Sequence, residues 1–178
     1  MLARTVFATQ MPAQIVLLLT QRPWICKTGA NCAGNRHSWS LKIWTQSSYN
    51  ISISGVFVSV KNSDCLVGAC IAWFDEQNGA PVSSLHWLIT KEAYQGRGIG
   101  STLIVTALSI YEKENAFPVY LHTQPWSYQA VRLYHKFGFR LMKQESFSGY
   151  ENQYALAVPV LARYIAPECM RELIERSE

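Results

Sequence analysis

The chain has 178 residues, of which 49% are apolar, 16% charged and 12% aromatic. This composition fits one globular domain with its own core, and it excludes disordered, collagen-like and coiled-coil proteins. No apolar run approaches the roughly 20 residues that cross a bilayer. Residues 15–19, the longest apolar run near the N-terminus, are too few for a signal-peptide core. We therefore expect neither a signal peptide nor a membrane partner.

The net charge of +4 is distributed unevenly. The first 63 residues contain six Lys or Arg and no Asp or Glu, whereas the remainder contains ten bases and twelve acids. An acid-free basic segment is compatible with an organelle-targeting leader or with an arm that faces nucleic acid. Six charges over 63 residues are a weak footprint for nucleic acid, and the Trp and Ile content of the segment fits burial. We therefore expect no nucleic-acid partner and no targeting leader.

The five cysteines are Cys26, Cys32, Cys65, Cys70 and Cys169. Their number is odd and no Cys-x-x-Cys pair occurs, so the spacing indicates neither a disulfide framework nor a zinc site. Cys65 and Cys70 lie in apolar, strand-like sequence, and we expect both to be small buried hydrophobic residues. This usage predicts a reduced, cytoplasmic protein.

The sequence falls into three parts. Residues 1–50 are a poorly patterned basic segment, in which residues 15–19 are a candidate first strand of the domain, closed off by Arg22-Pro23. Residues 28–40 are rich in Gly, Asn and Ser and are expected to form a loop. Residues 51–165 hold the patterned domain, and residues 166–178 are expected to form a C-terminal helix.

Hydrophobic periodicity and turn residues predict the elements after residue 50. Asn78-Gly79 marks a turn between strands. Ser127 is available as a helix N-cap and Gly138 as a helix stop. The expected elements are strands at 56–60, 65–74, 84–90, 119–123, 139–143 and 153–161, and helices at 101–113, at 127–137 and from about 167. This order predicts a mixed α/β domain.

A glycine-rich turn stands at the entrance to the helix expected from Ser101. Gly96, Gly98 and Gly100 have no Cβ, so the backbone can turn tightly and a ligand can approach it closely. The free N–H groups at a helix start carry roughly half a positive charge and suit a phosphate or pyrophosphate. Arg97 adds a cation with planar donors.

The glycines alone leave several ligands open. A dinucleotide fingerprint requires a glycine where Ser101 stands, so that match is partial, and a Walker A loop is absent. A nucleotide-binding regulator therefore remains an alternative, as does a tight turn that only joins a strand to a helix.

Two motifs together carry a resemblance to a known family. Residues 94–100, YQGRGIG, resemble the Gln/Arg-x-x-Gly-x-Gly/Ala pyrophosphate loop of the GNAT superfamily of acetyl-CoA-dependent N-acetyltransferases. Residues 127–139, SYQAVRLYHKFGF, resemble the Asn-x-x-Ala-x-x-Leu-Tyr-x-Lys-x-Gly-Phe signature of the same family. The resemblance covers about residues 53–161. It implies a GNAT-like fold, in which a central, mostly antiparallel mixed sheet splays at the acetyl-CoA site and is flanked by helices.

The resemblance also implies how acetyl-CoA is held. The strand that ends at residue 90 would splay from the strand at 119–123 and pair its exposed backbone with the pantetheine arm. Main-chain N–H groups of the glycine turn would hold the pyrophosphate. An N–H near residue 88 or 89 would polarise the thioester carbonyl, a contribution on the order of 3 kcal/mol. The implied cofactor-binding residues are Leu88, Ile89, Thr90, Gln95, Gly96, Arg97, Gly98, Ile99, Gly100, Ser101 and Ser127.

Tyr134 matches the tyrosine that protonates the departing thiolate in much of the family, and its phenol can hand a proton to sulfur as the C–S bond breaks. The residue type of Tyr134 and its position on the apolar face of the expected helix also fit a core aromatic residue. Two features depart from the family pattern. Ser127 stands where an asparagine is usual, and the segment before the first hairpin is shorter than the family's, which includes two helices that shape the acceptor pocket.

The general base stays open at this stage. His86 and His122 lie on the two strands that are expected to part, where a neutral imidazole suits proton transfer near pH 7, but each also fits a structural role. The predicted function is direct transfer of acetyl from acetyl-CoA to a primary amine, on a small molecule or peptide, within a ternary complex and without a metal. A catalytically degenerate CoA-binding sensor or interaction domain is the alternative. The family often forms dimers, so a homodimer is among the expected assemblies.

Overall fold

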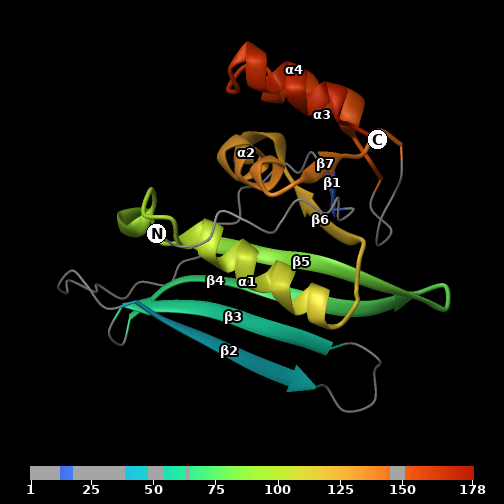
Figure 1. Ribbon diagram of the computed structural model, residues 1–178. Coiled ribbons are helices and arrows are strands. Elements are labelled where there is room, and N and C mark those ends of the chain that lie inside the picture. The colour runs from blue at the N-terminus through green and yellow to red at the C-terminus, as the bar shows by residue number, and fades with distance from the viewer. Residues whose placement is uncertain (1–12, 18–38, 48–53, 63–64, 145–150) are drawn as a thin grey trace.

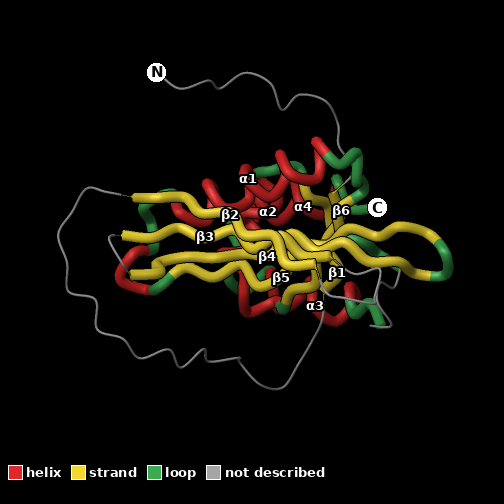
Figure 2. Tube along the Cα trace, turned by 90° about the horizontal axis from the view of Figure 1, so that it is seen from below, coloured by secondary structure: helices red, strands yellow, loops and turns green. Residues whose placement is uncertain are grey.

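The computed structural model describes residues 13–17, 39–47, 54–62, 65–144 and 151–178. In this part of the chain, seven strands form one mixed sheet in the order β2-β3-β4-β5-β6-β1-β7. Figure 2 shows helices on both sides of the strands, with α1 and α2 on one side and α3 on the other. The mixed α/β fold with a flanked sheet is therefore as predicted.

The elements have the following bounds. The strands are β1 (Ala13–Leu17), β2 (Trp39–Ser47), β3 (Ser54–Asn62), β4 (Cys65–Gln77), β5 (Ala80–Thr90), β6 (Val119–Thr123) and β7 (Phe139–Leu141). The α-helices are α1 (Ile99–Lys113), α2 (Tyr128–Lys136), α3 (Tyr154–Leu161) and α4 (Pro167–Glu175). Two 3₁₀ turns, η1 (Glu92–Tyr94) and η2 (Pro125–Ser127), precede α1 and α2.

The first half of the sheet is an antiparallel meander from β2 to β5. The predicted hairpin of β3 and β4 is present, and the turn between β4 and β5 falls at Asn78-Gly79 as predicted. Both turn residues have positive φ, 54° and 78°, which is the conformation that Asn-Gly adopts in a tight hairpin. The tip of the β4–β5 hairpin projects at one end of the molecule (Figure 1).

The second half of the sheet is parallel and draws on the start of the chain. β1 lies between β6 and β7 and is parallel to both. β2, also from the first 50 residues, forms the opposite edge beside β3. Both strands of this N-terminal segment therefore belong to the same sheet as the rest of the domain. The expected Arg22-Pro23 break and residues 28–38 of the expected loop lie outside the described residues. Trp39 and Ser40, also expected in that loop, begin β2 instead, because they pair with β3.

The core lies between the sheet and α1, which packs on β3, β4 and β5. Gly68 on β4 makes this close approach possible, because a Cβ there would lie 2.6 Å from the Ile99 Cγ2 atom. Burying side chains of this size contributes about 1.5–3 kcal/mol each. The largest fully buried side chains are Tyr111, Phe139, Leu103, Ile104, Leu121, Leu141, Leu161, Leu173 and Val58.

Residues 153–161 are the one predicted element whose type is wrong. They form the helix α3 rather than a strand. Their run of Val, Ala and Leu fits either a buried strand or a buried helix, and periodicity alone does not separate the two. Asn152 decides the outcome locally, since its Oδ1 accepts a hydrogen bond from the Tyr154 N–H at 3.0 Å and its Nδ2 donates to the Met142 carbonyl at 2.7 Å.

The cysteines follow the prediction in part. Cys70 is a free, fully buried thiol, as expected. Cys65 is also buried, but it is disulfide-bonded, so the expectation of a reduced thiol there is wrong. A disulfide joins residues that the fold brings together, whatever their spacing in the sequence, and for that reason the spacing gave no signal.

Among the described residues, no helix has both the length and the apolar character needed to span a bilayer.

Candidate active site

The strands β5 and β6 run together for only two residues and then part. Ser83 is registered with Val119 and Ser84 with Tyr120, yet β5 continues to Thr90. β6 follows β1 instead, to which it is registered along its whole length. Figure 1 shows β6 turning away from β5 beyond this point. In the described part of the chain, the edge of β5 after Ser84 is therefore left without a neighbouring strand.

A β-bulge deforms β5 just beyond the parting. Ile71 on β4 is registered with His86, but Ala69, two residues away, is registered with Ile89, so β5 carries one extra residue. Within the bulge Trp87 has a φ of +51°, which is unusual for a bulky residue, and its side chain is 77% exposed. A bulge bends its strand and re-aims the backbone, and bulges recur beside active sites. The predicted residues Leu88, Ile89 and Thr90 lie on this free edge.

Tyr111 on α1 fixes the sheet at the same place. Its hydroxyl donates to the Ser84 carbonyl oxygen at 2.6 Å and accepts from the Trp73 N–H at 3.1 Å. Burial raises the pKa of this phenol far above its usual value, so it stays protonated and can make both bonds. Apolar periodicity predicts the helix at 101–113 but assigns no role to the Tyr111 hydroxyl. A hydroxyl on an otherwise apolar helix face is the feature from which a buried hydrogen bond could have been predicted.

The glycine turn has the backbone shape that the sequence predicts. Gly96 and Gly98 have φ values of 72° and 82°, and a Cβ on either would meet no atom within 4 Å. The first helical bond of α1 is from the Thr102 N–H to the Gly98 carbonyl. The main-chain N–H groups of residues 98–101 make no hydrogen bond within the described residues. The start of this 15-residue helix thus presents open donors beside open space, the arrangement that binds anions.

The other residues of the turn have different roles. A Cβ on Gly100 would lie 3.0 Å from the Leu133 Cδ2 atom, so this glycine keeps α1 close to α2. The Ile99 side chain is buried in the core, which leaves only its backbone at the helix start. The Arg97 guanidinium is exposed and lies 5.2 Å from the centre of the Tyr94 ring. Such a cation–π contact holds the charge near the turn.

Three polar side chains flank the turn and α2. Gln95 donates from Nε2 to the Thr90 carbonyl at 3.4 Å, which links the turn to the end of β5. Ser127 stands at the N-cap position of α2, as predicted, but its side chain makes no capping hydrogen bond. Ser101 is partly buried in the first turn of α1, also without a side-chain hydrogen bond in the described region. The hydroxyls of both serines therefore remain available.

Tyr134 lies on α2 and is only 7% exposed. Its ring packs on Phe139 at a centre-to-centre distance of 5.6 Å. Its hydroxyl has no hydrogen-bond partner among the described residues, which is unusual for a buried phenol. Burial raises the pKa of Tyr134 well above its usual value, and the nearby Cys70 raises it further. The site thus contains a buried, protonated donor that has no acceptor in the part of the chain that the structure describes.

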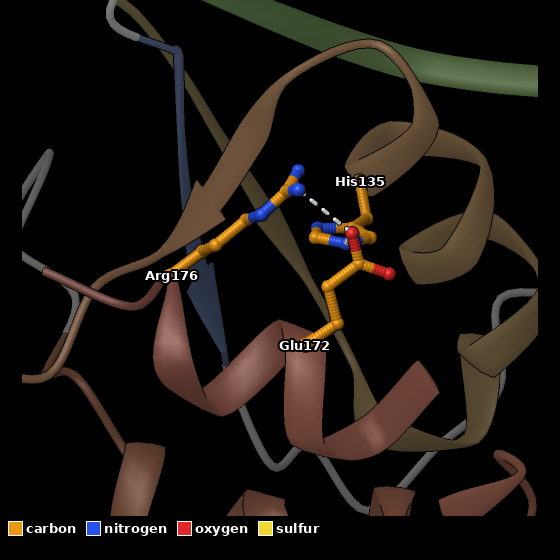
Figure 3. A network of polar contacts seen from close by, with 3 residues as sticks. All are labelled: His135, Glu172 and Arg176. Carbon is orange, nitrogen blue, oxygen red and sulfur yellow. Dashed lines mark ion pairs between the residues drawn. The ribbon is translucent and has the colours of Figure 1, made fainter. Parts of the chain in front are cut away.

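The far side of α2 is joined to the C-terminal helix. Glu172 on α4 places its Oε1 atom 2.8 Å from an Arg176 guanidinium nitrogen and 3.8 Å from His135 Nε2, as Figure 3 shows. Tyr128 at the start of α2 also stacks on Tyr164 at 5.1 Å. The Glu172–Arg176 pair lies within α4 and is exposed, and such pairs contribute about 1 kcal/mol or less. The His135–Glu172 contact and the Tyr128–Tyr164 stack link the helix that carries Tyr134 to the C-terminal part of the chain.

The region that contains these features matches a protein-family model. The family model described as "Acetyltransferase (GNAT) family" matches residues 24–139. The matched region contains the parted strands, the glycine turn and Tyr134. The chain therefore belongs to the GNAT acetyltransferase family. No curated protein matches the sequence significantly.

Solved structures with a similar fold include three that differ widely in source. A transcriptional regulator from Bacillus halodurans C-125 is 22% identical, with 54% of this chain and 65% of that chain covered and a TM-score of 0.47. A putative acetyltransferase from Agrobacterium tumefaciens str. C58 is 20% identical, with 56% and 69% covered and a TM-score of 0.45. A glucosamine-6-phosphate N-acetyltransferase from Arabidopsis thaliana is 12% identical, with 56% and 67% covered and a TM-score of 0.43. This chain thus spans slightly less than two thirds of the first of these proteins.

Proposed function

We propose that the protein is an N-acetyltransferase that transfers acetyl from acetyl-CoA to a primary amine by direct attack in a ternary complex. The observation that carries this proposal is the parting of β5 from β6 after Ser84, which leaves a free strand edge up to Thr90. Gln95 links Thr90 to the turn that leads to the open N–H groups at the start of α1. An anion site next to an unpaired strand edge fits a ligand that has a diphosphate at one end and an amide-containing arm at the other.

The diphosphate is proposed to lie at the start of α1. Main-chain N–H groups from Gly96 through Ser101 would donate to it, and the positive end of the helix would favour its charge. The Gln95 N–H, also expected as a donor, is bonded to the Glu92 carbonyl at 3.1 Å instead. The open space at Gly96 and Gly98 supports this, because side chains at those positions would otherwise stand between ligand and backbone. Arg97, held near the turn by Tyr94, would supply a cation.

The pantetheine arm is proposed to extend the sheet along β5. Leu88, Ile89 and Thr90 lie on the edge that β6 has left, and the arm's amides would pair with their main-chain groups. An N–H at Leu88 or Ile89 would then point at the thioester carbonyl. A donor aimed at the developing oxyanion contributes on the order of 3 kcal/mol to the transition state. The bulge at Trp87 supports this role, since it turns the backbone at that point.

Tyr134 is proposed as the general acid. As the amine nitrogen forms its bond to the carbonyl carbon, the C–S bond breaks and the sulfur takes a proton from the Tyr134 hydroxyl. The phenolate then regains a proton from solvent. The hydroxyl, which has no partner among the described residues, supports this role because it is free to donate to the sulfur. Burial raises the pKa of Tyr134, so the phenol is protonated before the C–S bond breaks. Ser127, at the start of the same helix, would contact the cofactor directly or through water.

Thermal stability with acetyl-CoA, followed by thiol release with a panel of primary amines, tests the proposal. We expect acetyl-CoA to raise the melting temperature and at least one amine to release the thiol. Stabilisation without thiol release from any amine would favour a CoA-binding sensor. Stabilisation by NAD or ATP, with none by acetyl-CoA, would overturn both and indicate a nucleotide-binding protein.

A further inference from the structure

We infer that His86, held in place by Ser84, accepts the proton that the attacking amine loses. This inference deepens the proposed function and rests on it. Direct attack requires two proton movements, one to the departing sulfur and one from the nitrogen. Tyr134 is suited to the first, and the second needs a base on the side from which the amine arrives.

Strand register shows which side chains share that face. The Phe74 ring lies 5.3 Å from the Tyr111 ring and the Cys70 thiol contacts the Leu103 carbonyl, so even-numbered β4 residues face α1. The odd-numbered residues Trp73 and Ile71 therefore face the other way. Side chains at registered positions lie on the same side of a sheet.

His86 and Ser84 are on the face away from α1. His86 is registered with Ile71 and Ser84 with Trp73, and the rings of His86 and Trp73 lie 5.9 Å apart. Tyr120, registered with Ser84, extends this face onto β6, and His122 follows two residues later. Cys70, which lies close enough to Tyr134 to raise the pKa of its phenol, belongs to the α1 face. The acid and the imidazole thus lie on opposite faces, at the place where β5 and β6 separate.

That opposition fits the reaction. The nucleophile approaches the plane of the thioester from one side, and the thiolate departs within the site that holds CoA. An amine that arrives from the His86 face meets the carbonyl carbon at the gap between the strands, while the sulfur stays near Tyr134. No described residue has to move across the sheet for either proton transfer.

The contact with Ser84 orients the ring for this role. His86 Nε2 lies 2.7 Å from Ser84 Oγ, and Ser84 is only 2% exposed, so its hydroxyl is shielded from solvent. When Nε2 carries the proton and donates it to Ser84 Oγ, Nδ1 keeps its lone pair and can accept a proton. The bond persists in the imidazolium form, in which both ring nitrogens are donors.

The surroundings of His86 keep it neutral at pH 7. Burial lowers the pKa of His86, and the charge of Asp75 offsets this in part. Among the described residues, Asp75 is the charged group that acts on it, and its neighbours on this face are Trp73, Ser84 and Ile71. Tyr120 and His122 are the polar β6 residues on the same face. In the reaction the amine nitrogen bonds to carbon, its proton passes to Nδ1, the C–S bond breaks, and the sulfur takes the Tyr134 proton.

The test is the variant His86→Gln in the full chain, with His122→Gln as the matched control on the neighbouring strand. A glutamine amide keeps a donor toward Ser84 but cannot take a proton. We expect kcat to fall at pH 7 by about 100-fold or more, with KM for acetyl-CoA unchanged. The loss should shrink toward high pH, where hydroxide can take the proton that the nitrogen loses. His122→Gln should lower kcat far less than His86→Gln does.

Ser84→Ala tests the orienting contact. Removing the acceptor of the Nε2 proton destabilises the imidazolium, so the acidic limb of the kcat/KM profile should move to lower pH and kcat should fall by less than in His86→Gln. An NMR titration of the His86 imidazole in the wild-type protein and in Ser84→Ala should give the lower pKa in the variant.

The outcomes separate the two proposals. A wild-type enzyme that acetylates amines, with the same pH profile in His86→Gln, would overturn the role of His86 and leave the proposed function standing. A large loss in His122→Gln alone would overturn it as well. If the wild-type protein binds acetyl-CoA but no amine in the panel causes thiol release, both the acetyl transfer and the role of His86 would be overturned.

Discussion

The Tyr111 hydroxyl, on α1, donates a 2.6 Å hydrogen bond to the carbonyl oxygen of Ser84, the last β5 residue that is registered with β6. The same hydroxyl accepts from the Trp73 N–H on β4 at 3.1 Å. A single phenol therefore links α1, β4 and β5 at the point where the sheet opens. This contact connects the helix that begins at the anion site with the strand edge that is proposed to bind the pantetheine arm.

Replacing Tyr111 by Phe removes both bonds and leaves a buried donor and a buried acceptor unsatisfied. We expect the free energy of unfolding to fall by about 1–3 kcal/mol, because unmade buried bonds carry that penalty. Urea denaturation measures the change. Tyr154→Phe is the matched control, since its hydroxyl contacts Ser177 at 3.1 Å in a half-buried position and its loss should matter less. An equal fall in the free energy of unfolding in both variants would contradict the larger contribution expected of the Tyr111 hydrogen bonds.

Gly98→Val should abolish acetyl-CoA binding. The new side chain would fill the open space beside the backbone N–H groups, and it would also adopt a strained φ near 82° at a cost of about 1–3 kcal/mol. Isothermal calorimetry measures the affinity. Gly79→Val is a matched control for strain, because Gly79 has a φ of 78° and equally open surroundings in the distant β4–β5 turn. Similar losses of stability, with affinity lost only in Gly98→Val, are expected. Unchanged affinity in Gly98→Val would contradict the anion site.

Tyr134→Phe should lower kcat by roughly 100-fold or more without weakening acetyl-CoA binding, because a general acid acts mainly in the transition state. The variant should unfold at the same or a higher urea concentration, since the hydroxyl that it loses has no partner in the described part of the chain. Steady-state kinetics and urea denaturation measure the two effects. Full activity would remove Tyr134 as the acid, and a marked loss of stability would show that its hydroxyl has a structural partner.

Stability should decline above about pH 10. The folded state raises the pKa of Tyr111 and Tyr134 above the value near 10 that they have in the unfolded chain. Below pH 10 both states are protonated, but above it only the unfolded state loses these protons, so each tyrosine lowers the free energy of unfolding by about 1.4 kcal/mol per pH unit. Urea denaturation between pH 8 and 11 measures this slope. Tyr134→Phe should reduce it, and an unchanged slope would contradict the burial of that phenol.

Several local features could be predicted from the amino-acid sequence alone. Asn78-Gly79 specified its turn because few residues adopt positive φ, and Gly138 ended α2 with a φ of 88° for the same reason. The turn at residues 95–100 and the helices after it follow from glycine spacing and from apolar periodicity. These features depend on interactions between near neighbours in the chain, which the order of residues states directly.

The remaining features arise from contacts between residues far apart in the sequence. The insertion of β1 between β6 and β7, the separation of β5 from β6, and the bridge from Tyr111 to Ser84 all join such segments. Sequence patterns showed which faces are apolar and which turns are tight. Only tertiary packing determined which of those faces meet, because burial rewards any apolar partner and the choice among partners depends on the shape of the whole sheet.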